Sequence, residues 1–139
     1  MAQRSIFRHA FVILAVSFAV GLVAGGLAPD PHARLWLSSH VSGIMTGLLM
    51  IGVGVVWPHL RLGATGEKVG LASAIGGNWV GLIIGIFAAL VHFPLKISTP
   101  ALPDVQGWQS GVVLAGLGVI TISTFVLCGV VLYGLRGAK

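Results

Sequence analysis

The stretch Gly111–Leu135 reads GVVLAGLGVITISTFVLCGVVLYGL and carries no charged side chain. A helix of roughly 20 apolar residues crosses the hydrocarbon core of a bilayer, so this stretch predicts a transmembrane helix. Three further apolar stretches precede it, at residues 9–28, 37–57 and 69–91. Because only short tails and loops remain, we expect an all-α membrane protein, a four-transmembrane-helix bundle in which residues 1–139 form a single domain.

The composition indicates that the bilayer is the main solvent of the chain, and it excludes several kinds of catalysis and cross-linking. Apolar residues make up 56% of the chain and charged residues 8%, whereas a soluble domain is about a quarter charged. No Asp, Glu, Lys or Arg falls within the four spans. Charged groups at that depth are costly and usually functional, so their absence excludes paired-carboxylate catalysis and argues against an ion-coupled transporter. The single cysteine, Cys128, excludes a disulfide framework.

The distribution of Lys and Arg indicates the orientation, because cytoplasmic segments carry an excess of both. The first and third loops hold only Arg34 and Lys96. We therefore expect both termini and the loop 58–68 on the cytoplasmic side of a bacterial inner membrane, with no nucleic-acid partner needed to explain the net charge of +5. A cleaved signal peptide is the alternative for the N-terminal span. The remaining basic residues are Arg4, Arg8, Arg61, Lys68, Arg136 and Lys139.

Small residues recur at every fourth position on three of the spans. Lipid provides no hydrophobic drive between helices, so such faces predict close helix contacts. They could all pack within one chain, or one of them could contact a second copy. The last span has a weaker set, Gly111 and Ala115, and is expected to face lipid more. The three sets are Ser17, Gly21 and Gly25; Gly43 and Gly47; and Ser73, Gly77, Gly81 and Gly85.

His40 lies near the start of the second span, on one helical stripe with Gly43, Gly47, Met50 and Gly54. An imidazole can bind iron, and a glycine face leaves room for a flat macrocycle. The alternative is a hydrogen-bonded histidine near the membrane interface. The stripe makes His40 a candidate metal ligand, and Gly43 and Gly47 candidate cofactor-binding residues.

Two other polar residues within the spans are candidates for catalysis. Asn78 lies in the third span, between glycines and Trp79, and its amide could bind a substrate or bond to a neighbouring helix. Thr46 could do the same, or return its hydroxyl to its own backbone. The other histidines are expected at the membrane interfaces; they are His9, His32, His59 and His92.

Several motifs together resemble one family, the hydroxylaminobenzene mutase and styrene oxide isomerase group. The resemblance covers nearly the whole chain and is most specific in His-x-x-Gly-x-Met-x-Gly. The WP and NW pairs and the ending LRG are closer to hydroxylaminobenzene mutase. The motifs are RHAF at 8–11, SHVSGIMTG at 39–47, WP at 57–58, NW at 78–79 and CGVVLYGLRG at 128–137.

The resemblance implies a homotrimer that binds haem b between subunits, with His40 as the iron ligand. It further implies a haem-dependent isomerase that rearranges N-phenylhydroxylamines to 2-aminophenols, with ferric haem as a Lewis acid. Small aromatic substrates could arrive through the lipid bilayer. Asn78 or Thr46 would then hydrogen-bond the substrate.

Two positions depart from the isomerase branch of this group. Thr46 stands where that branch has an asparagine, and Leu82 stands where it has a tyrosine. Both departures count against epoxide isomerisation, although the mutase branch also generally keeps the asparagine, so Thr46 leaves the substrate open. The alternatives are an epoxide-to-aldehyde isomerase, a non-catalytic haem-binding membrane subunit, and a channel or structural bundle without cofactor.

The charge bias predicts that a reporter fused after Lys139 lies in the cytoplasm. A fluorescent protein fused there should fluoresce, and alkaline phosphatase at the same position should be inactive, because it folds only after export. Phosphatase activity from that fusion would contradict the predicted orientation.

Overall fold

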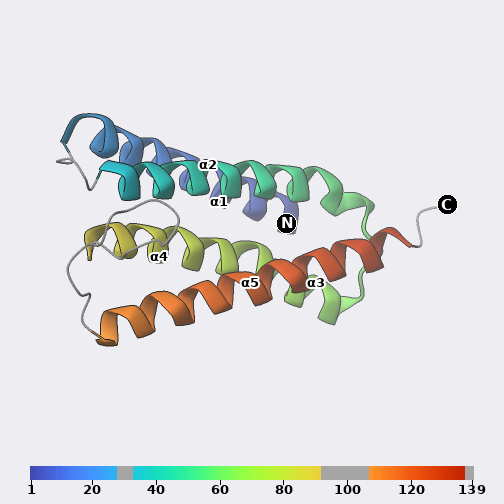
Figure 1. Ribbon diagram of the computed structural model, residues 1–139. Coiled ribbons are helices and arrows are strands. Elements are labelled where there is room, and N and C mark those ends of the chain that lie inside the picture. Colours follow the sequence, from blue (N-terminus) through green and yellow to red (C-terminus); the bar gives the residue numbers. More distant parts are fainter. Residues whose placement is uncertain (28–32, 92–106, 137–139) are drawn as a thin grey trace.

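The computed structural model describes residues 1–27, 33–91 and 107–136, and every long element among them is a helix (Figure 1). Consecutive helical segments form continuous helices, here called rods, and three of these rods contain a short π-helical or 3-10 segment. The third rod is continuous from α3 through η3 to α4. The elements are α1 (Ala2–Leu22), the π-helical η1 (Val23–Leu27), α2 (Ala33–Val56), the 3-10 turn η2 (Trp57–His59), α3 (Ala64–Leu71), the π-helical η3 (Ala72–Gly77), α4 (Asn78–Leu90) and α5 (Gly107–Leu135).

Four helices are long and apolar enough to cross a membrane: Ala2–Gly26, Ala33–His59, Ala64–Leu90 and Gly107–Leu135. They confirm the predicted all-α, four-transmembrane-helix architecture. All four begin several residues earlier than the apolar runs, because polar residues continue the helix beyond the apolar core. The predicted positions at Ala28, His32, His92, Lys96 and Lys139 lie outside the described residues.

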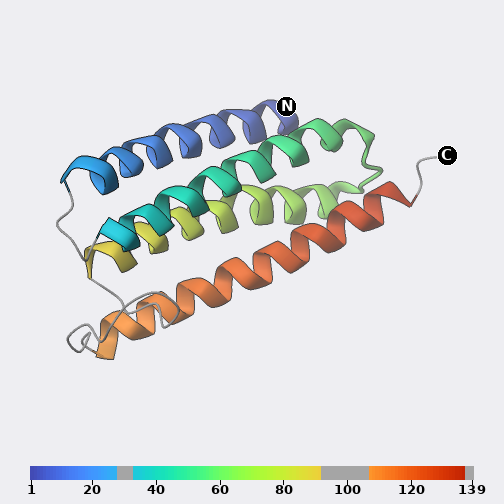
Figure 2. The ribbon, with the colours of Figure 1, turned by 45° about the horizontal axis from the view of Figure 1, so that its top comes forward.

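The helices are arranged in the order α1, α2, α4, α5 (Figure 2). α1 packs mainly on α2, α2 on α4, and α4 together with η3 on α5. α1 begins and α5 ends at the end of the bundle that carries the connection from η2 to α3 (Figure 1). This agrees with the even number of spans, and the compartment that this end faces stays a prediction.

Glycines on α2 make the contact with α1. A methyl group at Gly47 would come within 2.6 Å of Leu14, and one at Gly54 within 2.8 Å of Phe7. At Gly43 it would collide with Ser17, which is itself fully buried. The predicted use of small residues for close helix approach is confirmed here.

The contact between the third and fourth spans differs from the prediction in one respect. A methyl group at Gly77 would collide with Ser123, as expected for the small face of the third span. On α5, however, no atom of the described residues lies within 4 Å of the position of a methyl group added to Gly111, whereas Gly116 meets Ile84 closely. Gly116 therefore forms the close approach that the sequence suggested for Gly111.

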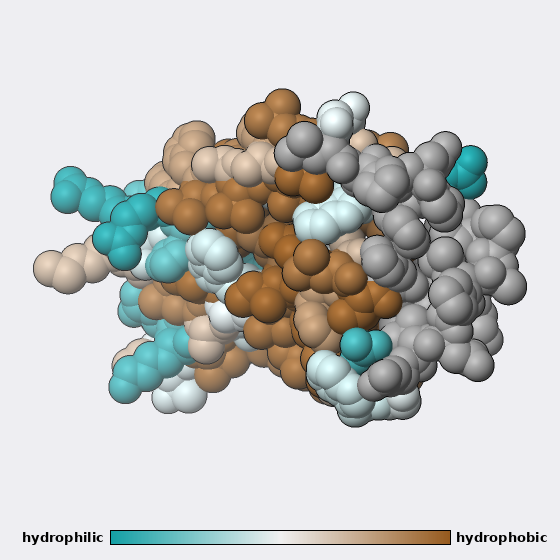
Figure 3. Space-filling model, turned by 90° about the vertical axis from the view of Figure 1, so that its left-hand side faces the viewer, coloured by the Kyte–Doolittle hydropathy of each residue, from teal (hydrophilic) through white to brown (hydrophobic). Residues whose placement is uncertain are grey.

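α5 is the least buried of the four spans. Only 17% of its apolar window is buried by the described residues, against 22–33% for the others, and that its uncovered surface faces lipid stays a prediction. Among the coloured residues of Figure 3, apolar side chains cover the middle of the face, and hydrophilic ones gather mainly at one edge. Trp57, at the end of the second apolar run, is buried in the bundle: it is 7% exposed and packs against Gly70.

Gly77→Ala should lower thermal stability, and Gly81→Ala should not. The added methyl group would overlap the short Ser123 side chain at position 77, whereas at position 81 it would lie 3.6 Å from Ile120. Overpacking of this kind costs about 1–3 kcal/mol, while alanine at an unhindered site favours the helix. Melting curves in mild detergent would test this, and equal melting temperatures for the two variants would contradict the packing of η3 and α4 on α5.

Candidate functional site

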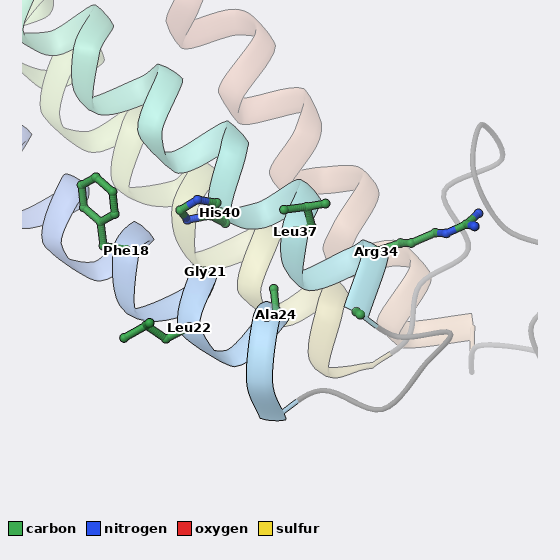
Figure 4. A pocket seen from close by; sticks show the side chains of 9 residues that line it. Phe18, Gly21, Leu22, Ala24, Arg34, Leu37 and His40 are labelled. Atoms are coloured by element: carbon green, nitrogen blue, oxygen red, sulfur yellow. The ribbon is translucent and has the colours of Figure 1, made fainter.

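A cavity of about 410 Å³ lies between the end of α1 with η1 and the start of α2. Its walls are mostly apolar, and His40 projects from α2 toward α1 at its inner end (Figure 4). The Arg34 side chain points away from the cavity at the opposite edge (Figure 4). Its lining includes Phe18, Gly21, Leu22, Arg34, Leu37 and His40.

The His40 imidazole is half-buried and contacts α1 at three points. Its Nδ1 lies 2.6 Å from the carbonyl oxygen of Ser17. The ring of Phe18 meets it edge-on at 6.0 Å between centroids, and the backbone of Gly21 lies against its flat face. Within the described part of the chain, Nε2 has no hydrogen-bond partner.

A metal bound by side chains alone needs several ligands brought together. Among residues 1–27, 33–91 and 107–136, no three His, Cys, Asp or Glu side chains are close enough to share a metal ion. A single imidazole nitrogen in an apolar cavity suits a cofactor that brings its own equatorial ligands, as haem does. The donor set around His40 therefore fits haem and does not fit a metal ion held by the protein alone.

The structure places Gly43 and Gly47 elsewhere than predicted for a cofactor surface. Both are buried in the contact with α1, against Ser17 and Leu14 respectively. Neither lines the His40 cavity. A macrocycle could lie on them only if α1 moved away from α2.

Thr46 and Asn78 line a second, narrower cavity of about 160 Å³ between α2, α4 and α5. The side-chain Nδ2 of Asn78 donates to the Ala74 carbonyl at 2.5 Å, one turn back on its own rod. Among the residues with described positions, neither Asn78 Oδ1 nor the Thr46 hydroxyl has a hydrogen-bond partner. Asn78 directly follows η3, and π-helical turns are frequent at functional sites.

Within one chain, the structure brings Thr46 and Asn78 together but not His40. A shallow hollow on the exposed face of α2 lies between the two cavities and shares Arg34 with the first and Thr46 with the second. Ser38 and Ser42 line both this hollow and the second cavity.

The two serines were not singled out from the sequence. Ser38, Ser42 and Thr46 recur at every fourth position of an apolar span, so their hydroxyl groups share one helix face. This spacing could have identified the two serines from the sequence, because three hydroxyls aligned in a membrane helix require polar partners.

Trp79 and Leu82 have structural roles and do not line the second cavity. Trp79 Nε1 donates to Nδ1 of His9 at 3.0 Å, which joins α4 to α1. Leu82 is 4% exposed and lies against Gly43. The apolar residue at position 82 is therefore part of the core.

Comparison with known proteins supports the resemblance. The sequence model of the styrene oxide isomerase family matches residues 2–136. Hydroxylaminobenzene mutase HabB of Ectopseudomonas oleovorans is 30% identical over 125 residues, which cover 87% of this chain and 76% of that protein. Hydroxylaminobenzene mutase HabA of the same organism is 34% identical over 71 residues, or 48% of this chain and 53% of that protein. No solved structure matches significantly. The chain belongs to the styrene oxide isomerase family.

Proposed function

We propose that this protein is a haem-dependent membrane isomerase that rearranges N-phenylhydroxylamines to 2-aminophenols. The observation that carries the proposal is its similarity to hydroxylaminobenzene mutase HabB over 87% of the chain. The cavities add to it, because they combine a histidine nitrogen, an amide and hydroxyl groups with apolar walls. An apolar aromatic substrate is compatible with these walls and with entry from the bilayer.

In this proposal His40 is the residue that holds haem b. Nε2 would bind the iron, and the edge-on ring of Phe18 and the backbone of Gly21 would hold the imidazole in place. Bound ferric haem would supply a Lewis acid for the substrate oxygen. Gly43 and Gly47 would act indirectly, by letting α1 approach α2 closely enough to reach the imidazole.

Asn78 and Thr46 would bind the polar end of the substrate. Asn78 keeps one Nδ2 hydrogen and its Oδ1 acceptor for a ligand, since its other Nδ2 hydrogen is donated to Ala74. A hydroxylamine has N–H and O–H donors as well as acceptors, so it can use both groups. An epoxide oxygen only accepts, and it would leave the Oδ1 acceptor without a partner.

The apolar surroundings would protect the reacting molecule from water. Leu35, Val113, Leu117 and Ile120 line the cavity around Asn78 and Thr46. Excluding water strengthens the hydrogen bonds to the substrate and prevents capture of a cationic ring by hydroxide or water. These side chains therefore favour return of the oxygen to the adjacent ring carbon.

His40 and Asn78 line different cavities of one chain, and a homotrimer would allow them to cooperate. If the His40 side of one copy packs on the Thr46 side of the next, the contact joins two different faces. Such heterologous contacts close into rings when the rotation permits, whereas a two-fold dimer would join identical faces. The hydroxyls of Ser38, Ser42 and Thr46 would then lie next to a neighbouring copy.

Epoxide-to-aldehyde isomerisation is the second candidate, and the family name favours it. Leu82, where the isomerase branch has tyrosine, is buried against Gly43 outside the second cavity. No phenolic donor is present there to hold an epoxide oxygen. A haem-carrying subunit without catalysis usually needs a second axial ligand, and His9 is already bonded to Trp79.

Purified protein from cells supplied with a haem precursor should show a Soret band that His40→Ala abolishes. The alanine leaves iron without its protein ligand. His59→Ala is the matched control, because His59 is exposed in η2, and it should keep the band. Wild-type protein without haem, or full haem content in His40→Ala, would refute the assignment.

Asn78→Ala should lower the turnover of phenylhydroxylamine while haem content is unchanged. Loss of one preorganised hydrogen bond typically reduces kcat by roughly ten- to a thousandfold. Thr121→Ala is the control, since Thr121 is exposed on α5 and bonds its own backbone at Leu117. Rapid conversion of styrene oxide to phenylacetaldehyde, with phenylhydroxylamine left untouched, would show that the other branch of the family is the right one.

A further inference from the structure

We infer that α1 positions the His40 imidazole: the Ser17 carbonyl holds a proton on Nδ1, and Gly21 leaves room for the ring, so that Nε2 is the nitrogen presented to a ligand. Ser17 and Gly21 are positioning residues, because they act on His40 and not on the substrate. The inference rests on the proposed function only where it names haem iron as the ligand of Nε2.

The short contact at Nδ1 determines which nitrogen carries the proton. A carbonyl oxygen can only accept a hydrogen bond, and the oxygen of Ser17 lies 2.6 Å from Nδ1. If Nδ1 were unprotonated, two lone pairs would face each other at that distance. A carbonyl has two lone pairs, so the Ser17 oxygen can also accept the bond of its own helix. A neutral His40 therefore has its hydrogen on Nδ1 and a lone pair on Nε2.

Gly21 determines whether the ring can reach that carbonyl. A methyl group on Gly21 would lie 2.5 Å from Nδ1, 2.6 Å from Cε1 and 3.0 Å from Cγ of His40. All three are ring atoms, so the whole imidazole would have to move. At Gly52 on α2, by contrast, no atom of the described residues lies within 4 Å of the corresponding position.

The side chain of Ser17 has a fixed position in the contact between α1 and α2. Ser17 is fully buried, and its hydroxyl donates to the Ile13 carbonyl at 2.7 Å. It also fills the space opposite Gly43 on α2. Groups that accept the second N–H of a ligating histidine fix both its tautomer and its orientation.

The first test reads the tautomer without haem. Apo-protein labelled with ¹⁵N-histidine, in bilayers and mildly alkaline buffer, should show a protonated Nδ1 and an unprotonated Nε2 at His40. The His40→Gln variant identifies its signals among the five histidines. A His40 protonated on Nε2 would overturn the inference, and this measurement needs no variant of α1.

The second test compares Gly21→Ala with Gly52→Ala. Gly21→Ala should shift the His40 nitrogen signals and weaken the binding of ferric haem about ten- to a hundredfold, the usual loss for an orienting group of a metal ligand. Gly52→Ala, on the same helix as His40 but outside both cavities, should change neither. Unchanged signals and unchanged affinity in Gly21→Ala would overturn the inference.

The two tests separate this inference from the proposed function. Wild-type protein that binds no haem but has the Nδ1-protonated tautomer would refute the haem assignment and support the positioning by α1. Protein that binds haem through His40 but has the opposite tautomer in the apo form would refute the positioning alone.

Discussion

The close contact between α1 and α2 is the interaction on which the other features of this protein depend. Lipid tails are as apolar as the side chains, so moving an apolar side chain from lipid to a helix contact gains little free energy. Helices in a membrane therefore associate through dense packing and hydrogen bonds. Gly43, Gly47 and Gly54 let α1 approach, and Ser17, Leu14 and Phe7 occupy the space that they leave. The same approach brings the Ser17 carbonyl to His40. Packing and the chemistry of the histidine are therefore parts of one contact.

A further consequence of this packing is that the polar side chains proposed for the site lie on two different sides of α2. His40 faces the end of α1, whereas Thr46 and Asn78 face the space toward α5. The exposed face of α2 between them carries Leu37, Val41 and Met45. A protein that uses both sides in one reaction needs a second copy to connect them, and this links the proposed chemistry to the proposed assembly.

The sequence predicted the elements well and their partners less well. Apolar length located the four spans, and four-residue spacing located the small faces on α2 and on the third rod. Spacing identifies a face of a helix but not the neighbour that covers it, so it could not show that Ser17 and Leu14 lie against Gly43 and Gly47. The role of these two glycines in cofactor binding stays a prediction. For the same reason Gly116 could not be distinguished from Gly111, and Trp57 at a helix end could not be recognised as buried. The hydrogen bond from Trp79 to His9 joins residues 70 positions apart, and no local pattern predicts such a pair.

α1 is held to the rest of the bundle by polar bonds along much of its length. Gln3 donates to the Gly54 carbonyl at 3.0 Å, Trp79 donates to His9, and His40 bonds Ser17. Glycine faces alone are smooth and would permit α1 to slide along its axis. Sliding by one turn, about 5.4 Å, would break all three bonds together, with no water in the hydrocarbon core to replace those that lie there. The polar bonds thus help to set the axial register of α1, so that this helix packs on its neighbours at one height only.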